Sequence, residues 1–346
     1  MAQSRTKTKS IAKQRFVLLR PLWRHTYARY VMYGATAMLV SALAVLAVSF
    51  STPTKVVPDS KVENKIITIA AVGDIACSHA SVVAAAAKNL NECKHTQVLD
   101  KITQLKPSAV LLLGDLQYDR GAADDFNKVF IPSWQQTGLI GYAVAGNHEY
   151  GTPQAKDFYS LLSSQRIATG EQGKGYYKIA LGEWDVFALN SNCEFVGGCG
   201  TDSEQYRWLT RELEASRAKC SMALWHHPVF TSGNYSKDLS SLNRMRTILK
   251  LVSDKGVDVV LNGHDHMYER FEPMDLDGPA STKPMQFTIG TGGKSLYKVN
   301  DIKMVGSQFT ASTYGYVQFK LAGESFSWSF NTLDGTQLDI GKQACH

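Results

Sequence analysis

The sequence lacks several features that are typical of particular classes of protein. The 346 residues contain no low-complexity tract and no internal repeat, which speaks against a largely disordered chain and a repeat architecture. Residues 1–30 contain no Asp or Glu, and residues 31–50 contain no charged side chain. The composition is otherwise ordinary, with 44% hydrophobic and 20% charged residues, and is compatible with a large buried core.

The net charge of +6 comes from the N-terminal segment. Residues 1–30 contain eight Lys or Arg, and without them 29 basic side chains remain against 31 acidic ones, a balance of −2. The main part of the chain therefore lacks the basic excess that is typical of nucleic-acid binding, and we expect no nucleic-acid partner.

Residues 31–50 form an uninterrupted apolar run. Twenty helical residues span about 30 Å, the thickness of a bilayer's hydrocarbon core. This predicts a single-pass transmembrane signal-anchor, with residues 1–30 as a basic cytoplasmic tail and the rest of the chain outside the cytoplasm. The alternative is a signal peptide cleaved near Ala47 and Ser49, which would give a secreted protein. The long basic segment and the long apolar run favour the uncleaved anchor, so the predicted location is the cell membrane.

The six cysteines all follow the apolar run, and outside the cytoplasm they are expected to pair. Cys193 and Cys199 flank a short loop with two glycines and are the easiest pair to close. A zinc site would require further ligands such as a His or a Cys-x-x-Cys motif, and neither accompanies these two cysteines. We also predict the disulfides Cys77–Cys93 and Cys220–Cys345.

Residues 51–64 have the composition of a linker, and residues 65–346 are expected to form one catalytic domain. Buried strands alternate with helices in its first part, and antiparallel hairpins dominate after residue 285. This pattern predicts an α/β fold, a four-layer α-β-β-α sandwich of two packed mixed sheets flanked by helices. Strands are expected at 66–72, 109–113, 142–145, 176–181, 185–189, 221–225, 257–261, 285–289, 314–321 and 325–331, and helices at 80–90, 94–106, 122–135, 154–163, 203–218 and 239–253.

Five short polar clusters each begin where a predicted buried strand ends. The carboxyl ends of strands are where α/β sheets bind ligands, so the clusters can converge on one site. A glycine beside a ligand allows the sharp turn that brings the backbone close to a metal. The clusters are Gly73-Asp74, Gly114-Asp115-Leu116-Gln117-Tyr118, Gly146-Asn147-His148-Glu149, His226-His227-Pro228 and Gly263-His264-Asp265-His266.

The residue types in these clusters suit a centre with two metal ions. Carboxylates, carboxamide oxygens and imidazoles bind Zn, Fe and Mn without a thiolate. Two metals about 3.5–4 Å apart need a bridging anion, which a carboxylate can provide, and together they acidify a water and clamp a phosphate ester. Taken singly, Asp74 and Asp115 could instead cap turns at the strand ends.

Taken in order, the clusters resemble the calcineurin-like metallophosphoesterases, and among them the purple acid phosphatases, over about residues 65–345. The resemblance implies a first metal bound by Asp74, Asp115, Tyr118 and His266. A second metal would be bound by Asp115 as the bridge, Asn147, His226 and His264. His148 would face the substrate and donate a hydrogen bond or a proton. His226 is taken as the ligand because the family pattern is His-x-Pro, which leaves His227 as a second-sphere or substrate contact.

One departure from the wider superfamily points to iron. Most members carry a His two residues after the first Asp, and here that position is Ala76, while Tyr118 offers a phenol. A phenol of ordinary pKa near 10 binds a metal at neutral pH only as phenolate, which Fe(III) stabilises best. We therefore expect Fe(III) in the first site and divalent Fe, Zn or Mn in the second. Tyr118 as a packed aromatic is the alternative.

Other polar residues receive simpler interpretations. His79 and His95 lie outside the pattern and are expected on the surface or in helices. Residues 290–293, Gly-Thr-Gly-Gly, resemble a phosphate-binding loop, but no helix follows, so a turn is expected. Residues 119–120 and 268–270 adjoin the ligands and could support them or form surface ion pairs.

The predicted function is that of an acid phosphatase-like enzyme that hydrolyses phosphate monoesters through a hydroxide held by the two metals. A phosphodiesterase acting on nucleotides or lipid head groups could use the same centre. A surface binding protein on a degenerate phosphatase scaffold is a further alternative, which the complete ligand set disfavours. The oligomeric state is not predicted.

Overall fold

The computed structural model describes residues 66–280, 282 and 284–346. The predicted basic tail 1–30, signal-anchor 31–50 and linker 51–64 lie outside the described residues. Within the described part, no helix combines the length and the apolar character needed to cross a membrane.

The described strands form two sheets, and the first is parallel in one half and antiparallel in the other. Strand β1 (Ile67–Val72) pairs in parallel with β2, and β2, β3 and β4 continue in parallel. On the other side β1 pairs antiparallel with β13, which continues into β14 and β15. The strand bounds are Ala109–Leu112 for β2, Gly141–Ala143 for β3, Ile167–Ala168 for β4, Gly315–Ala322 for β13, Ser325–Thr332 for β14 and Gln337–Ala344 for β15.

The second sheet has the order β10-β9-β11-β8-β7-β6-β5, and β12 pairs with β9. Strands β6, β7, β8 and β11 run parallel, and β5 and β9 are antiparallel to their neighbours. The bounds are Tyr177–Leu181 for β5, Trp184–Ala188 for β6, Cys220–Leu224 for β7, Val259–Asn262 for β8, Tyr268–Asp275 for β9, Gly278–Pro279 for β10, Met285–Ile289 for β11 and Ser307–Ala311 for β12.

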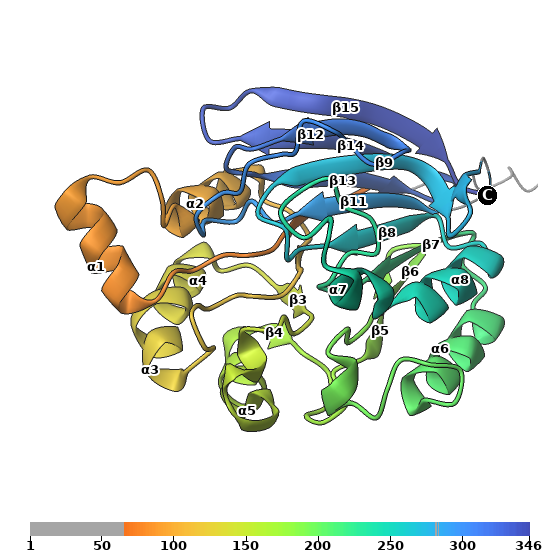
Figure 1. Ribbon diagram of the computed structural model, residues 1–346, viewed down its shortest axis with the longest axis horizontal. Helices are drawn as coiled ribbons and strands as arrows, with labels where there is room; N and C mark the ends of the chain where they lie inside the picture. The colour runs from red at the N-terminus through yellow and green to blue at the C-terminus, as the bar shows by residue number, and fades with distance from the viewer. Residues whose placement is uncertain (1–65, 281, 283) are drawn as a thin grey trace, which may run out of the picture. The chain divides into compact units, whose positions relative to one another are not determined.

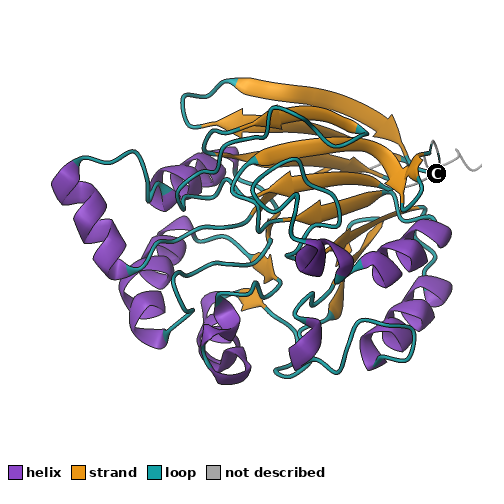
Figure 2. Ribbon diagram, in the orientation of Figure 1, coloured by secondary structure: helices purple, strands orange, loops and turns teal. Residues whose placement is uncertain are grey.

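Helices lie on both sides of the strands (Figures 1 and 2). Helices α2 and α4 gather on one side, and α6 and α8 on the other (Figure 1). The helix bounds are His79–Lys88 for α1, His95–Leu105 for α2, Ala123–Asp125 for α3, Ile131–Thr137 for α4, Lys156–Leu162 for α5, Glu204–Ala215 for α6, Leu239–Asn243 for α7 and Arg246–Asp254 for α8.

Buried side chains fill the spaces between these layers. Ile69 and Ala71 of β1 point into the cluster between the two sheets, where they join residues such as Met222 and Phe287. Ala70 and Val72 point to the opposite face and pack with α2 and α4. Among the described residues, a further cluster places α6 and α8 against the outer face of the second sheet. The predicted α/β sandwich of two mixed sheets flanked by helices is therefore confirmed.

Several predicted elements differ in detail from the structure. The helix expected at 122–135 consists of α3, a π-helical segment (Phe126–Phe130) and α4, which has a proline in its first turn. The helix expected at 239–253 is interrupted between α7 and α8. Strand β15 was missed because it is an exposed edge strand without apolar alternation. Strand β9 was missed because it contains charged residues and a proline.

All six cysteines lie in the described part, and they form the predicted disulfides. The Cα–Cα distance is 5.5 Å for Cys77–Cys93, 5.3 Å for Cys193–Cys199 and 5.4 Å for Cys220–Cys345. Cys220 opens β7 of the second sheet, and Cys345 directly follows β15 of the first. This disulfide therefore links the two sheets covalently.

Candidate metal centre

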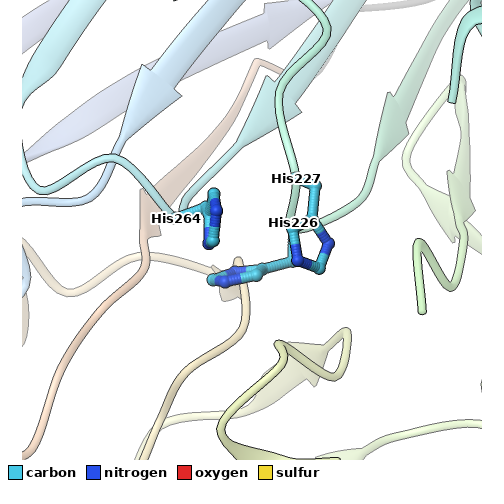
Figure 3. A group of neighbouring side chains, drawn as sticks. All are labelled: His226, His227 and His264. Carbon is cyan, nitrogen blue, oxygen red and sulfur yellow. The ribbon is translucent and has the colours of Figure 1, made fainter. Parts of the chain in front are cut away.

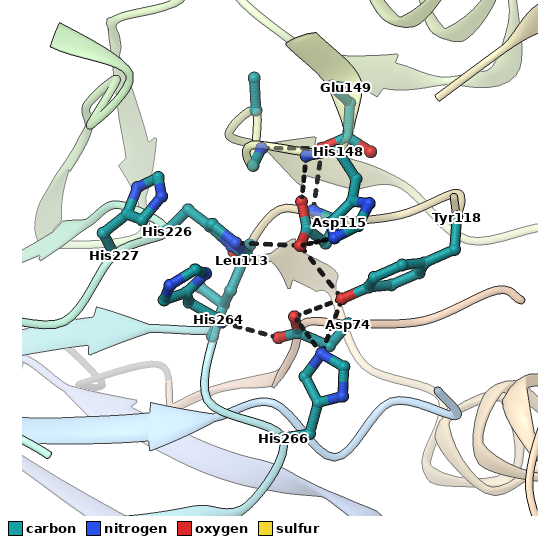
Figure 4. Close-up of polar contacts among 12 residues, drawn as sticks. Asp74, Leu113, Asp115, Tyr118, His148, Glu149, His226, His227, His264 and His266 are labelled. Atoms are coloured by element: carbon teal, nitrogen blue, oxygen red, sulfur yellow. Dashed lines mark hydrogen bonds and ion pairs between the residues drawn. The ribbon is translucent and has the colours of Figure 1, made fainter. Parts of the chain in front are cut away.

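The strand-end clusters meet at one place, to which both sheets contribute. Asp74 follows β1, Asp115 follows β2 and Asn147 follows β3, all in the first sheet. His226 follows β7 and His264 follows β8, both in the second sheet. Figure 4 shows the Tyr118 hydroxyl and the rings of His226 and His266 directed toward the carboxylates of Asp74 and Asp115. The prediction that the strand ends converge is confirmed.

The backbone turns sharply where three of the predicted ligand residues follow their strands. Asp74, Asp115 and His264 adopt left-handed conformations, with φ of 60°, 50° and 70°. Neighbouring glycines make room for these turns. A Cβ on Gly263 would lie 2.7 Å from a carboxylate oxygen of Asp74, and a Cβ on Gly146 would overlap the Asp115 carboxylate. Glycine is therefore required here by close packing against the carboxylates.

The hydroxyl of Tyr118 lies at the centre of one half of the site. Its Oη is 2.8 Å from Asp74 Oδ1, 3.0 Å from Asp115 Oδ2 and 2.9 Å from His266 Nε2. The side chain is 1% exposed. Burial, followed by the charges of Asp115 and Asp74, raises the pKa of Tyr118 well above its usual value. The phenol therefore keeps its proton unless a strongly polarising cation displaces it.

Backbone carbonyls orient two of the imidazoles. His226 Nδ1 lies 2.8 Å from the carbonyl oxygen of Leu113, and His266 Nδ1 lies 2.7 Å from that of Ser295. A ring that donates through Nδ1 presents Nε2 to the site, the arrangement that orients histidines as metal ligands. In both rings Nε2 faces a carboxylate, 3.2 Å from Asp115 for His226 and 3.4 Å from Asp74 for His266.

The His226 ring provides a test of whether a metal fits. Its Nε2 is buried, and among the described residues it has Asp115 Oδ2 at 3.2 Å but no partner in good hydrogen-bond geometry. Burial lowers the pKa of His226, but the nearby Asp115 carboxylate outweighs this and raises the pKa to about 9. A positive charge is thus favoured between His226 and Asp115, and a metal cation can supply it in place of a proton. Asp74, Asp115 and His226 have donor atoms close enough to bind one ion.

A group of three histidines extends the site on the side of the second sheet. The donor atoms of His226, His227 and His264 lie within 4.8 Å of one another (Figure 3). Burial, followed by neighbouring His226, lowers the pKa of His264 well below its usual value, so its ring is in the neutral form that binds metals. His227 is buried, and its Nδ1 lies 2.8 Å from Ser191 Oγ. Its predicted role in catalysis remains a prediction.

His148 lies at the accessible side of the centre, and Asn147 precedes it in the chain. Asn147 is exposed, and His148 is partly exposed. The backbone N–H of His148 donates to Asp115 Oδ1 at 2.9 Å, and its Nε2 lies 3.8 Å from Asp115 Oδ2. The His148 ring packs 4.2 Å from that of Tyr118, measured between centroids.

Two supporting residues received no role from the sequence. The buried Glu149 carboxylate accepts hydrogen bonds from the backbone N–H groups of Asp115 at 2.9 Å, Leu116 at 2.8 Å and Gly146 at 2.7 Å. It thereby fastens the turns after β2 and β3 to each other. The sequence feature that could have pointed to Glu149 is its place in the third strand-end cluster. Lys294 follows the turn at 290–293, and its Nζ lies 4.8 Å above the Tyr118 ring and 3.2 Å from Asp119 Oδ1.

The model of the calcineurin-like phosphoesterase family matches residues 67–268. The chain belongs to this family. The match runs from β1 to the start of β9 and includes every strand end that contributes a predicted ligand.

Within this calcineurin-like family, the curated relatives that the chain resembles are purple acid phosphatases. It is 26% identical over 256 residues to purple acid phosphatase 18 of Arabidopsis thaliana, with 68% of this chain and 56% of the relative covered. It is also 26% identical over 265 residues to Fe(3+)-Zn(2+) purple acid phosphatase 12 of the same plant, with 65% and 54% covered. The chain thus spans about half the length of these relatives.

A solved structure shares the fold. A purple acid phosphatase from yellow lupin (Lupinus luteus) seeds superposes with a TM-score of 0.65 at 18% identity, over 82% of this chain and 54% of that one. The predicted resemblance to purple acid phosphatase-like metallophosphoesterases is confirmed.

Proposed function

We propose that the protein is a two-metal phosphatase that hydrolyses phosphate monoesters. The observation that carries this proposal is the position of the Asp115 carboxylate. Its Oδ2 lies 3.0 Å from Tyr118 Oη in one half of the site and 3.2 Å from His226 Nε2 in the other. A carboxylate that faces donors on both sides is suited to bridge two cations. The purple acid phosphatase relatives support the same activity.

The proposed ligand sets follow the two halves of the site. Asp74, Tyr118 and His266 join Asp115 at the first metal, and Asn147, His226 and His264 join it at the second. Fe(III) is proposed in the first site because Tyr118 Oη lies 2.8 Å from Asp74 Oδ1 and 3.0 Å from Asp115 Oδ2, and a phenol binds at neutral pH only as phenolate, which a trivalent ion stabilises best. Divalent Fe, Zn or Mn is proposed in the second, and the relative named for Fe(3+) and Zn(2+) supports this pairing.

In this proposal the two ions supply Lewis-acid activation of the ester and a nucleophile at neutral pH. The residues of the chain position the substrate. His148 is partly exposed beside Asp115, so its ring can donate a hydrogen bond or a proton to the phosphate or the leaving group. His227 is buried against His264, at 4.4 Å between ring centroids, and would act by holding that ligand in place.

We also propose that the catalytic domain lies outside the cytoplasm on the anchor at residues 31–50. The three disulfides support an oxidising compartment. A reporter fused after Phe50 should be detected on the outer face of the membrane. A cytoplasmic reporter would contradict the topology, and release of the domain into the medium would indicate cleavage of the segment.

Metal analysis combined with an ester screen tests the function. The purified protein should contain two metal ions per chain and release phosphate from a chromogenic monoester faster than it cleaves the matching diester. A preference for the diester would favour the phosphodiesterase alternative. Absence of both metals after growth with iron and zinc would favour a binding protein on a degenerate scaffold.

A further inference from the structure

Two tyrosines outside the proposed ligand set stack on ligand histidines. The Tyr235 ring lies 3.9 Å from the His264 ring at an interplanar angle of 25°. The Tyr297 ring lies 4.1 Å from the His266 ring at 7°. One tyrosine therefore borders each proposed metal site. Neither was identified from the sequence, because neither belongs to a strand-end cluster.

The two tyrosines also contact each other and form one aromatic corner. Their ring centroids are 6.1 Å apart, and the rings are inclined at 62°. Each side chain is only partly buried. The corner is thus a partly accessible aromatic surface beside a centre whose other side chains are mainly charged or hydrogen-bonding.

Hydrogen bonds hold the corner in place. The Asp265 carboxylate, between the two ligand histidines in sequence, accepts from Thr231 Oγ1 at 2.7 Å and from the Tyr235 N–H at 3.3 Å. The Tyr297 N–H donates to the carbonyl oxygen of His266 at 2.9 Å. Both tyrosines are therefore tied to the backbone or side chains of the His264–His266 turn.

The loops that carry the tyrosines are also joined to each other. Asn300 Nδ2 donates to the carbonyl oxygen of Gly233 at 2.8 Å and to Ser236 Oγ at 2.8 Å. The Asn300 N–H donates to the carbonyl oxygen of Ser232 at 3.1 Å. The corner does not need a closing loop to form, so little ordering would be required when a ligand binds.

We propose that Tyr235 and Tyr297 form a subsite for the organic group of the substrate, and that this subsite favours phosphate monoesters of planar aromatic groups. The inference rests on the proposed function, because it assumes that a phosphate lies at the metal centre. The organic group of the ester then has to lie beside the phosphate. There the two aromatic rings can stack on a planar group but cannot stack on a non-planar one.

Two substrates of similar size test the subsite. Phenyl phosphate and cyclohexyl phosphate carry the same charge and differ in the planarity of the organic group. We expect Tyr235→Leu and Tyr297→Leu to lower the ratio of kcat/KM for phenyl over cyclohexyl phosphate by about threefold to tenfold relative to the wild type. The matched variants Tyr235→Phe and Tyr297→Phe keep the ring and should preserve the ratio. Comparing ratios removes the difference in chemical reactivity between the two esters.

A parallel fall for both esters, accompanied by loss of metal, would show that the tyrosines only support the ligand histidines and would overturn the proposal. Binding of phenylphosphonate and cyclohexylphosphonate, which are not hydrolysed, separates the subsite from the proposed catalytic function. The wild type should bind phenylphosphonate more tightly even if it turns over no ester. Equal affinity for the two phosphonates would refute the subsite, whatever the enzymatic activity.

Discussion

The two sheets supply different chemistry to the same centre. In the proposed ligand set, the oxygen donors Asp74, Asp115, Asn147 and Tyr118 follow strands of the first sheet, and the imidazoles of His226, His264 and His266 follow strands of the second. Neither sheet contributes both kinds of proposed ligand, although the first sheet also brings the His148 imidazole beside Asp115. The proposed centre is thus a property of the interface between the sheets, and it depends on how one sheet is packed against the other.

Bonds across the interface make each sheet dependent on the other. The backbone N–H of His264 in the second sheet donates to Asp74 Oδ2 of the first at 2.9 Å. In the other direction, Leu113 at the end of β2 orients His226 through its carbonyl oxygen, at 2.8 Å. The Cys220–Cys345 disulfide adds a covalent link between the same sheets. Because the two sheets contribute different kinds of proposed ligand, we expect substitutions at the oxygen donors and at the imidazoles to affect activity and metal binding to different extents.

The largest effect is expected at Asp115, which serves both halves of the centre. Asp115→Asn removes charge from the bridge and should lower activity more than tenfold with loss of bound metal. His264→Ala, in the second sheet, affects one metal and should be less damaging. Metal analysis and kcat/KM for a chromogenic monoester measure both. An Asp115→Asn variant that keeps two metals and more than a tenth of the activity would contradict the bridging assignment.

A smaller effect on activity is expected at Tyr118. If its phenolate binds Fe(III), the oxidised protein should have a broad visible absorption band. Tyr118→Phe keeps the ring packing and should abolish the band, while activity falls only in part because the Asp115 bridge remains. Visible spectra of the iron-loaded proteins decide this. A band that survives the substitution excludes Tyr118 as ligand, and a colourless wild type argues against the iron-containing first site.

The covalent link between the sheets should affect stability more than chemistry. Cys220 and Cys345 are separated by 125 residues, so removing their disulfide by a double Cys→Ala change should cost about 3–5 kcal/mol of unfolding free energy. The matched control removes Cys193–Cys199, which are separated by 6 residues, at a cost of about 2 kcal/mol. Denaturant unfolding measures both. Equal losses would mean that the link between the sheets does not act through chain entropy.

The smallest effect is expected at Lys294, whose Nζ lies 4.8 Å above the Tyr118 ring. A positive charge near a phenolate lowers the energy of the phenolate electrons and so raises the energy of charge transfer from the phenolate to Fe(III). Lys294→Gln removes this charge and should therefore shift the visible band to longer wavelength without abolishing it. Lys294→Arg keeps the charge and should leave the band nearly in place. An identical shift in both variants would indicate a change in packing instead of charge.

Much of the fold and most of the candidate site could be predicted from local patterns. The buried strands that precede Asp74 and Asp115 are continuous apolar runs, and the polar clusters directly follow them. Edge strand β15 is not predicted, because one face and both ends of the strand are exposed and its sequence therefore lacks the apolar pattern of a buried strand. Glu149 lay within a recognised cluster, but its role required knowledge of which backbone N–H groups its carboxylate would meet.

The sequence by itself determined which residue types stand at the strand ends, because strand periodicity and the glycines that permit sharp turns are local properties of the chain. Only the tertiary structure decided that the proposed oxygen ligands and the proposed imidazole ligands would come from opposite sheets. It also placed Tyr235 and Tyr297 against His264 and His266, and Lys294 over Tyr118. Such contacts join residues that are distant in sequence. They depend on how whole sheets and loops pack together, and no local sequence pattern predicts that packing.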